Sequence, residues 1–251
     1  MTKSGAIFPV LAKRFFECLL PNTCLLCYHS NSEIICLTCR QRYLQVSPEL
    51  RCQRCALTLA SLSTHSLCVN CIKETPAFDQ TICAFDYAAP QDQLLLAFKF
   101  AQQLALGKAF ADLLHRAILA HKPAILPELL SAVPLSPQRL ADRGYNQAAE
   151  IARHLAPKLA RPYIPDLILR EKDTLPQSRL NYQERKKNVK AAFSLNLAYL
   201  TQISGKHIGL VDDVMTTGAS LNEIATMLKL FGASQITVYV LARTPLSTHT
   251  H

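Results

Sequence analysis

The chain has 251 residues, of which 49% are hydrophobic, and a formal net charge of +9 at pH 7. A chain of this length and composition can bury a sizeable core, and it fits one large domain or a typical domain plus a small one. No stretch reaches the roughly 18 uninterrupted apolar residues of a membrane span, so we expect no transmembrane segment.

Residues 1–22 are expected to form an N-terminal amphipathic helix. Its apolar positions recur along one face, namely Ile7, Leu11, Phe15 and Cys18. Lys13, Arg14 and Glu17 interrupt the apolar run, which therefore makes a poor secretory signal peptide. We expect this helix to pack on the rest of the protein, and peripheral contact with a membrane is the alternative.

Residues 23–75 are interpreted as a zinc-finger domain, because eight of the ten cysteines fall there in four C-x-x-C pairs. The pairs are Cys24/Cys27, Cys36/Cys39, Cys52/Cys55 and Cys68/Cys71. Four thiolates complete a closed tetrahedral site of the structural kind, so the pattern predicts two structural Zn²⁺ ions. The spacing favours two consecutive sites, while a cross-braced arrangement stays open. Cysteines that hold metal indicate a reducing compartment, and we expect a cytoplasmic protein.

Residues 76–245 alternate between strand and helix patterns, and residues 246–251 are expected to be a flexible tail. Expected strands lie at 82–87, 130–133, 167–169, 208–211 and 236–241. Helices are expected around 94–98, 110–117 and 146–155, and after residue 220, where apolar residues recur at helical spacing. Strands separated by helices predict an α/β fold with a mainly parallel sheet and helices on both faces.

The segment IGLVDDVMTTGAS, residues 208–220, has the pattern of a strand, an anion-binding loop and a helix. The helix N-terminus and the hydroxyls of Thr216, Thr217 and Ser220 suit a phosphate. Asp212 and Asp213 would repel a phosphate, but they suit the vicinal hydroxyls of a ribose. The alternative is a tight strand-to-helix turn in which Asp and Thr only cap the helix. The segment resembles the 5-phosphoribosyl-1-pyrophosphate (PRPP) motif of type I phosphoribosyltransferases.

Three further stretches extend this resemblance to a particular family. They are LLLAFKF at 94–100, PLSPQRLADRGYNQAAEIA at 134–152 and LREKDTLPQSRLNYQERKKNVKAAF at 169–193. Together with the cysteine pairs, they resemble the ComF family (ComFC and GntX-like proteins) over essentially the whole chain. The resemblance implies a phosphoribosyltransferase-like domain with an N-terminal zinc finger. It also implies a role as a competence protein in natural transformation and DNA uptake.

The resemblance assigns a catalytic role to Asp212 and Asp213, which would face the ribose. Ligand binding would also involve the loop that follows, Val214, Met215, Thr216, Thr217, Gly218, Ala219 and Ser220. Arg139 and Arg143 are expected phosphate-binding cations, because guanidinium forks suit phosphate oxygens. Lys99 follows an apolar helical stretch and is expected to point into the same cleft. Each could instead be a solvated surface charge. We expect Asn146 to cap the following helix rather than to bind ligand.

The expected ligand is PRPP or a related phosphoribosyl compound with Mg²⁺, and the candidate partners are single-stranded DNA and DNA-uptake or recombination proteins. The basic segment 170–190 could be a lid, a DNA contact or a solvated loop. Two functions stay open. One is a competence protein that acts on internalised single-stranded DNA, and the other is an active phosphoribosyltransferase with an unidentified acceptor. A zinc-dependent adaptor with an inactive site is less favoured, because both aspartates are present.

Overall fold

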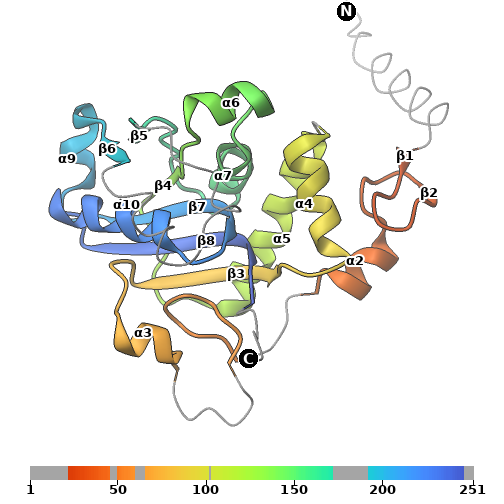
Figure 1. The fold of residues 1–251 in the computed structure, drawn as a ribbon, viewed down its shortest axis with the longest axis horizontal. Helices are drawn as coiled ribbons and strands as arrows, with labels where there is room; N and C mark the ends of the chain where they lie inside the picture. Colours follow the sequence, from red (N-terminus) through yellow and green to blue (C-terminus); the bar gives the residue numbers. More distant parts are fainter. Residues whose placement is uncertain (1–21, 46–49, 60–65, 102, 172–191, 246–251) are drawn as a thin grey trace, which may run out of the picture. The chain divides into compact units, whose positions relative to one another are not determined.

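The computed structural model describes residues 22–45, 50–59, 66–101, 103–171 and 192–245 (Figure 1). The helix expected over residues 1–22, the tail and nearly all of the basic segment 170–190 lie outside the described residues. The contacts divide the chain into two compact units, residues 1–45 and residues 46–251. The boundary falls between the first and the second group of four cysteines.

Residues 22–45, the described part of the first unit, contain a short hairpin and one helix. Strand β1 (Asn22–Thr23) pairs antiparallel with β2 (Ser30–Asn31), and α2 (Leu37–Tyr43) follows. Cys36 is the N-cap of α2, and its sulfur accepts a hydrogen bond from the backbone N–H of Cys39 at 3.4 Å. The cysteine pairs therefore lie where the backbone turns, as expected of metal-binding knuckles.

The second unit is built on a four-stranded parallel sheet with the strand order β3-β8-β7-β4. The strands are β3 (Gln80–Asp86), β4 (Leu129–Ala132), β7 (His207–Met215) and β8 (Gln235–Arg243). The central strands are buried almost throughout, which explains why they appear in the sequence as continuous apolar runs rather than as alternating patterns. The expected mainly parallel sheet is confirmed.

Helices cover both faces of this sheet (Figure 1). Helix α5 (Ala105–His121) packs on β3 and β8, and α7 (Gln147–Lys158) packs on β4 and β7. Helix α10 (Ala219–Leu230) lies on the opposite face, against β8. The helices around 94–98, 110–117 and 146–155 are all present with their apolar residues buried, because each apolar stripe faces the sheet or a neighbouring helix.

The described part of the second unit also contains shorter elements. They are α3 (Val69–Lys73), α4 (Gln91–Phe100), α6 (Pro137–Arg143), β5 (Ile168–Arg170), β6 (Phe193–Leu195), the 3-10 helix η2 (Leu197–Tyr199) and α9 (Leu200–Ile203). Strands β5 and β6 pair antiparallel in a separate two-stranded sheet. The strand expected at 167–169 therefore exists, but it lies outside the main sheet.

Two boundaries differ from the sequence expectation. Strand β7 continues to Met215, because it keeps its parallel pairing with β8 as far as the Met215–Arg243 pair. Both aspartates thus belong to the strand and not to the loop. Helix α7 runs through Pro157 to Lys158, since a proline so near the helix end removes a single backbone hydrogen bond.

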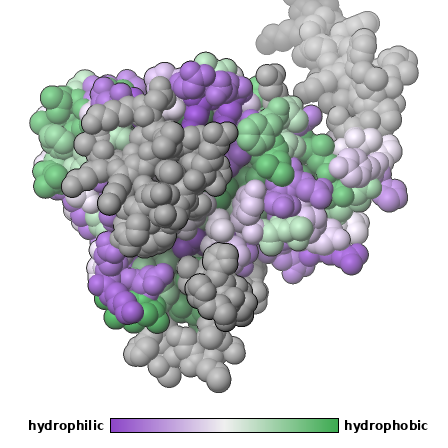
Figure 2. All heavy atoms as spheres, viewed as in Figure 1, coloured by the Kyte–Doolittle hydropathy of each residue, from purple (hydrophilic) through white to green (hydrophobic). Residues whose placement is uncertain are grey.

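Several apolar side chains are exposed together at a part of the second unit away from the sheet's carboxyl edge. Leu197, Leu200, Leu230 and Phe231 are exposed around α9 and the end of α10. Figure 2 shows apolar side chains gathered there, at the left of the view. Among the residues that the structure describes, no helix combines the length and apolar character needed to cross a bilayer.

Candidate functional site

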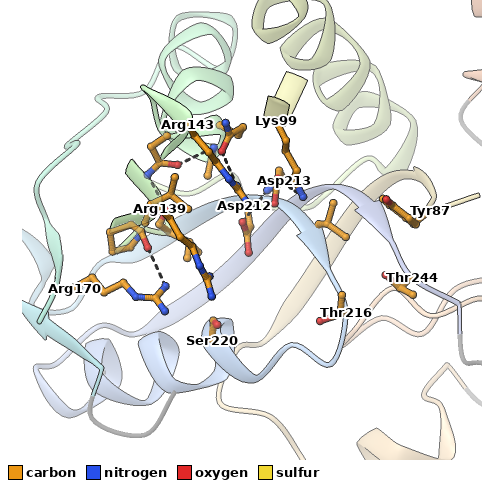
Figure 3. Close-up of a pocket in the computed structure, with 17 residues that line it drawn as sticks. Tyr87, Lys99, Arg139, Arg143, Arg170, Asp212, Asp213, Thr216, Ser220 and Thr244 are labelled. Atoms are coloured by element: carbon orange, nitrogen blue, oxygen red, sulfur yellow. Dashed lines mark hydrogen bonds and ion pairs between the residues drawn. The ribbon is translucent and has the colours of Figure 1, made fainter. Parts of the chain in front are cut away.

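A pocket of about 530 Å³ opens at the carboxyl edge of the sheet (Figure 3). All four strands of the sheet end at it, through Tyr87 after β3, Val133 after β4, Asp212 and Asp213 on β7, and Thr244 after β8. In open parallel sheets this edge is where ligands bind, because the loops there leave backbone and side-chain polar groups free to face them.

Asp213 forms an ion pair with Lys99 at the base of the pocket (Figure 3). The Lys99 ammonium lies 2.7 Å from Asp213 Oδ2, and the two side chains are 18% and 14% exposed. Lys99 comes from the last turn of α4, so the contact joins residues far apart in the chain. Asp212 faces the same pocket, and its Oδ1 accepts a hydrogen bond from the backbone N–H of Asp213 at 2.8 Å.

The two carboxyl groups differ in their tendency to ionise. Burial, followed by the charge of Asp213, raises the pKa of Asp212 well above its ordinary value. Burial acts in the same direction on Asp213, but Lys99 and then Arg143 overcome it and lower the pKa of Asp213. Two acidic groups this close cannot both ionise easily, so Asp213 holds the negative charge of the pair.

The loop after β7 presents polar groups at the N-terminus of α10. Val214, Thr216 and Ser220 line the pocket. Gly218 is the N-cap of α10 with a φ of +78°, a left-handed conformation that suits glycine. Thr217 precedes this N-cap, and its hydroxyl accepts a hydrogen bond from Ala219 N–H at 3.3 Å; Thr217 is not among the residues that line the pocket. Met215, the residue before this loop, is buried in the core.

Three arginines face the same pocket (Figure 3). Arg139 and Arg143 lie on α6, and Arg170 ends β5. Arg143 donates to Gln147 Oε1 at 2.9 Å, and its guanidinium lies 5.6 Å from the centre of the Phe100 ring. In Figure 3, Arg139 and Arg170 are directed to the part of the pocket where Ser220 lies. With Lys99, these side chains give the pocket an excess of positive charge over the aspartate pair.

Asn146 caps α7, as expected from the sequence. Its side-chain oxygen accepts hydrogen bonds from Ala148 N–H at 3.0 Å and Ala149 N–H at 3.3 Å. Its amide nitrogen donates to the Val133 carbonyl at 3.0 Å, and this bond joins the helix start to the end of β4. Asn146 also lines the pocket, so the cap holds one wall of the site in place.

Tyr87 and Thr244 line the pocket and were not singled out from the sequence. Tyr87 and Thr244 directly follow β3 and β8, so the rule that ligands collect at the carboxyl ends of strands could have identified them. Arg170 begins the basic segment 170–190. It donates to the Pro134 carbonyl at 3.4 Å and stacks on Phe193 at 5.2 Å from the ring centre.

The eight paired cysteines form two separate clusters in chain order. One is Cys24, Cys27, Cys36 and Cys39, and the other is Cys52, Cys55, Cys68 and Cys71; within each cluster the sulfur atoms lie within 4.8 Å of one another. The consecutive arrangement is therefore confirmed over the cross-braced one. The first cluster belongs to the unit 1–45, and the second belongs to the unit that contains the pocket.

The clusters fit zinc and not disulfides. The sulfurs of Cys27 and Cys36 are 3.8 Å apart and those of Cys55 and Cys68 are 3.6 Å apart, far beyond a disulfide bond. A tetrahedral ion with Zn–S bonds of about 2.3 Å places its sulfurs roughly 3.8 Å apart. Hydrogen bonds from Cys55 and Cys71 lower the pKa of Cys52, while bonds with Cys52 and Cys55 raise the pKa of Cys71. A divalent cation bound to these four sulfurs would replace the thiol protons.

Comparison with known proteins agrees with this architecture. The family model described as "Phosphoribosyl transferase domain" matches residues 140–250. Solved structures that resemble the chain include glutamine PRPP amidotransferase from B. subtilis, with 20% identity, a TM-score of 0.34 and coverage of 53% of this chain and 26% of that chain. The protein TT1426 from Thermus thermophilus has 13% identity, a TM-score of 0.34 and coverage of 58% and 86%. The fold is of the phosphoribosyltransferase class, with an added pair of four-cysteine clusters.

Similarity to named proteins identifies one family within this fold class. Competence protein F of Haemophilus influenzae is 34% identical over 83% of this chain and 90% of its own length. DNA utilization protein YhgH of Escherichia coli is 31% identical over 77% and 84%. Competence protein ComFC of Streptococcus pneumoniae is 24% identical over 93% and 99%. The chain belongs to the ComF family of competence and DNA utilization proteins.

Proposed function

We propose that the pocket binds PRPP, or a related phosphoribosyl compound, together with Mg²⁺. We also propose that the protein uses this ligand while it acts on internalised single-stranded DNA in the cytoplasm. The observation that carries the ligand proposal is the meeting, in one pocket, of the Asp212–Asp213 pair, the N-terminus of α10 and the basic side chains of α4, α6 and β5.

Each part of PRPP has a matching group in this pocket. A 5′-phosphate suits the N-terminus of α10, where the helix dipole is positive, and the hydroxyls of Thr216 and Ser220. Ribose hydroxyls suit carboxylate acceptors such as Asp213, which is ionised. The pyrophosphate would lie toward Arg139 and Arg143 on α6, whose planar guanidinium groups bind phosphate oxygens in pairs.

The donor set also fits Mg²⁺. This hard cation takes oxygen ligands and commonly binds through one or two carboxylates together with substrate phosphates. Asp212 and Asp213 are the candidate protein ligands, and Lys99 keeps Asp213 deprotonated for this role. Bound Mg²⁺ would offset the negative charge of the pyrophosphate. Because an incoming cation competes with the Lys99 ammonium, ligand binding would loosen the ion pair at the base of the pocket.

The role in DNA handling is supported by the relatives, two of which carry the name competence protein and one the name DNA utilization protein. The pocket's excess of positive charge and the chain's net charge of +9 suit a polyanionic partner. DNA-uptake or recombination proteins are the protein partners we propose. Cysteine clusters suited to metal, rather than disulfides, agree with a reducing cytoplasm.

Calorimetry with PRPP and Mg²⁺ tests the ligand proposal. We expect saturable binding to the intact protein and at least about a tenfold weaker binding to Asp212→Asn/Asp213→Asn, because the negative charge of Asp213 and both candidate Mg²⁺ ligands are lost. Asp112→Asn on α5, whose side chain is 46% exposed, is the matched control and should bind as the parent does. No binding to the intact protein contradicts the proposal.

Two further assays separate the possible uses of the ligand. Pyrophosphate release from PRPP in the presence of candidate acceptors, DNA ends included, would identify an active transferase. Binding of single-stranded DNA should weaken steeply with salt if the basic groups contact phosphates. A salt-independent response would argue against a DNA contact. If the double aspartate variant loses PRPP binding and still supports transformation, the ligand is irrelevant to DNA handling.

A further inference from the structure

Arg243, the last residue of β8, is a buried cation held by backbone carbonyl groups. The residue is 5% exposed. Its Nε donates to the Cys55 carbonyl at 2.9 Å. Its Nη1 donates to the carbonyls of Met215 at 3.0 Å and Thr244 at 2.7 Å, and also to the Thr216 carbonyl. One guanidinium group therefore joins three separate segments of the chain.

The carbonyl groups that Arg243 contacts belong to two parts of the protein, the second cysteine cluster and the segment between the aspartate pair and α10. Cys55 is a member of the second cysteine cluster. Met215 ends β7 and Thr216 begins the loop that leads to α10, and Thr216 lines the pocket. Thr244 reinforces the junction, because its N–H donates to the Met215 carbonyl at 3.0 Å. Arg243 thus connects the cluster directly to the loop that would hold the phosphate.

The rest of the cysteine knuckle is bonded to the same sheet. Thr81 N–H donates to the Gln53 carbonyl at 3.1 Å, and the Thr81 hydroxyl donates to the Arg54 carbonyl at 2.5 Å. Arg54 Nη1 donates to the Phe78 carbonyl at 2.8 Å. Phe78 lies in the hydrophobic core that contains Met215. The cluster is therefore part of the framework that supports the loop.

Because one guanidinium group donates to several carbonyl oxygens, a movement of one carbonyl alters the hydrogen bonds to the others. Its N–H donors are fixed in one plane, so a shift of one carbonyl cannot be followed without loss at another. A buried charged donor without an acceptor is costly, which favours a concerted shift over a broken bond. Without metal in the second cluster, the turn that carries the Cys55 carbonyl would lose a restraint, and the carbonyls of Met215 and Thr216 would shift through their shared contact with Arg243.

We propose that Arg243 is a positioning residue that couples metal in the second cysteine cluster to ligand affinity in the pocket. This inference rests on the proposed function, since it requires a phosphorylated ligand at the loop. Zinc bound at the second cluster holds the Cys55 carbonyl in place, and Arg243 then holds the loop in its binding geometry. Coupling between two binding sites is reciprocal, so the bound ligand must also retain the zinc.

Zinc release from the full-length protein tests this coupling without measuring any activity. A chromogenic zinc chelator is added with and without saturating PRPP and Mg²⁺, and release is followed by absorbance. We expect the ligand to slow the release of one of the two ions by about fivefold or more. The variant Cys24→Ser/Cys27→Ser lacks the first site, so the ion that stays responsive is assigned to the second cluster.

Two variants assign the coupling to Arg243. Arg243→Met should retain two zinc ions and release them at rates that the ligand no longer changes. Arg243→Lys should restore part of the effect, because an ammonium group can still donate to some of the carbonyls. A purely structural role would lower stability in both variants and leave the ratio of release rates as in the parent.

The outcomes are distinct for the two proposals. Absence of PRPP binding to the intact protein overturns the proposed function and this inference with it. Binding of PRPP without any change in zinc release overturns the inference alone, and this measurement needs no variant. Coupling that persists unchanged in Arg243→Met also overturns the role assigned to Arg243.

Discussion

Lys99 Nζ and Asp213 Oδ2 lie 2.7 Å apart at the base of the pocket, with both side chains mostly buried. The pair joins the end of α4 to the end of β7. This part of the pocket is therefore formed by residues more than a hundred positions apart in the chain. Removing one partner of such a pair leaves a poorly solvated charge. The balance of charge in the pocket therefore depends on Lys99.

Replacing Lys99 by methionine should weaken the binding of PRPP with Mg²⁺ at pH 7.5 by about tenfold or more, because the pocket loses a cation and the pKa of Asp213 rises. Lys99→Arg should retain most of the affinity. Lys108→Met, on the exposed face of α5, is the matched control. Calorimetry provides the measurement, and equal affinities for the Lys99→Met and Lys108→Met proteins would contradict a binding role.

Gly218 and Gly205 allow the loop's geometry to be tested against an equal backbone strain elsewhere. Gly218 has a φ of +78° at the start of α10, and Gly205 has a φ of +70° near the start of β7, at the opposite end of that strand from the pocket. An added Cβ meets nothing closer than 3.7 Å at either position, so the strain comes from φ alone.

Each glycine-to-alanine change should cost about 1–2 kcal/mol of unfolding free energy, since a left-handed backbone disfavours a side chain. Only Gly218→Ala should also weaken ligand binding, because it changes the turn that presents Thr216 and Ser220. Denaturant unfolding and calorimetry on both variants give the comparison. A ligand affinity lowered equally in both would show that general destabilisation is the cause.

Much of the fold could be predicted because its signals are local. The apolar runs of β7 and β8, and the helical spacing of Leu221, Ile224 and Leu228, identify their elements without knowledge of the partners. The end of β7 was not predictable in this way. Asp212 and Asp213 are poor strand formers, and they are held in the strand by pairing with a segment that comes nearly thirty residues later.

Pocket residues that belong to a local sequence motif could be predicted, whereas residues placed there by contacts between distant parts of the chain could not. The PRPP-like segment indicated the two aspartates and the loop. Arg243 gave no signal, because an arginine at a strand end has the same sequence pattern whether it is solvated or buried. Strand β6 was also missed, since three residues with one polar position give no periodicity. Only its pairing with β5 defines it.

Metal analysis should find two zinc ions per chain, and Cys52→Ser should leave one. The second cluster borders the main core, where Ala56 is buried and Cys55 packs against the same residues. Losing this ion should therefore lower the melting temperature by about 10 °C or more, given the large share of folding free energy that structural zinc supplies. Cys27→Ser also removes one ion, but from the other compact unit, so a smaller shift is expected. Fewer than two ions in the parent protein would rule out the two-site arrangement.

His207 gives the main unit a dependence of stability on pH. It is 5% exposed at the start of β7, and its Nε2 lies 2.8 Å from Thr237 Oγ1. Burial lowers its pKa, although the charges of Asp79 and Glu128 act in the opposite direction. The unfolded chain therefore binds a proton near pH 6.5 while the folded protein does not, and stability is present above that pH and is lost as the pH falls below it.

We expect the unfolding free energy to fall between pH 7.5 and 5.5, with a contribution from His207 of at most about 1.4 kcal/mol per pH unit. His207→Gln keeps a polar group near Thr237 and removes the titration, so its stability should vary less over this range. His121→Gln, at the exposed end of α5, controls for the loss of a histidine. Urea unfolding at closely spaced pH values provides the data. If the His207→Gln protein shows the same pH dependence as the parent, a group other than His207 governs stability in this range.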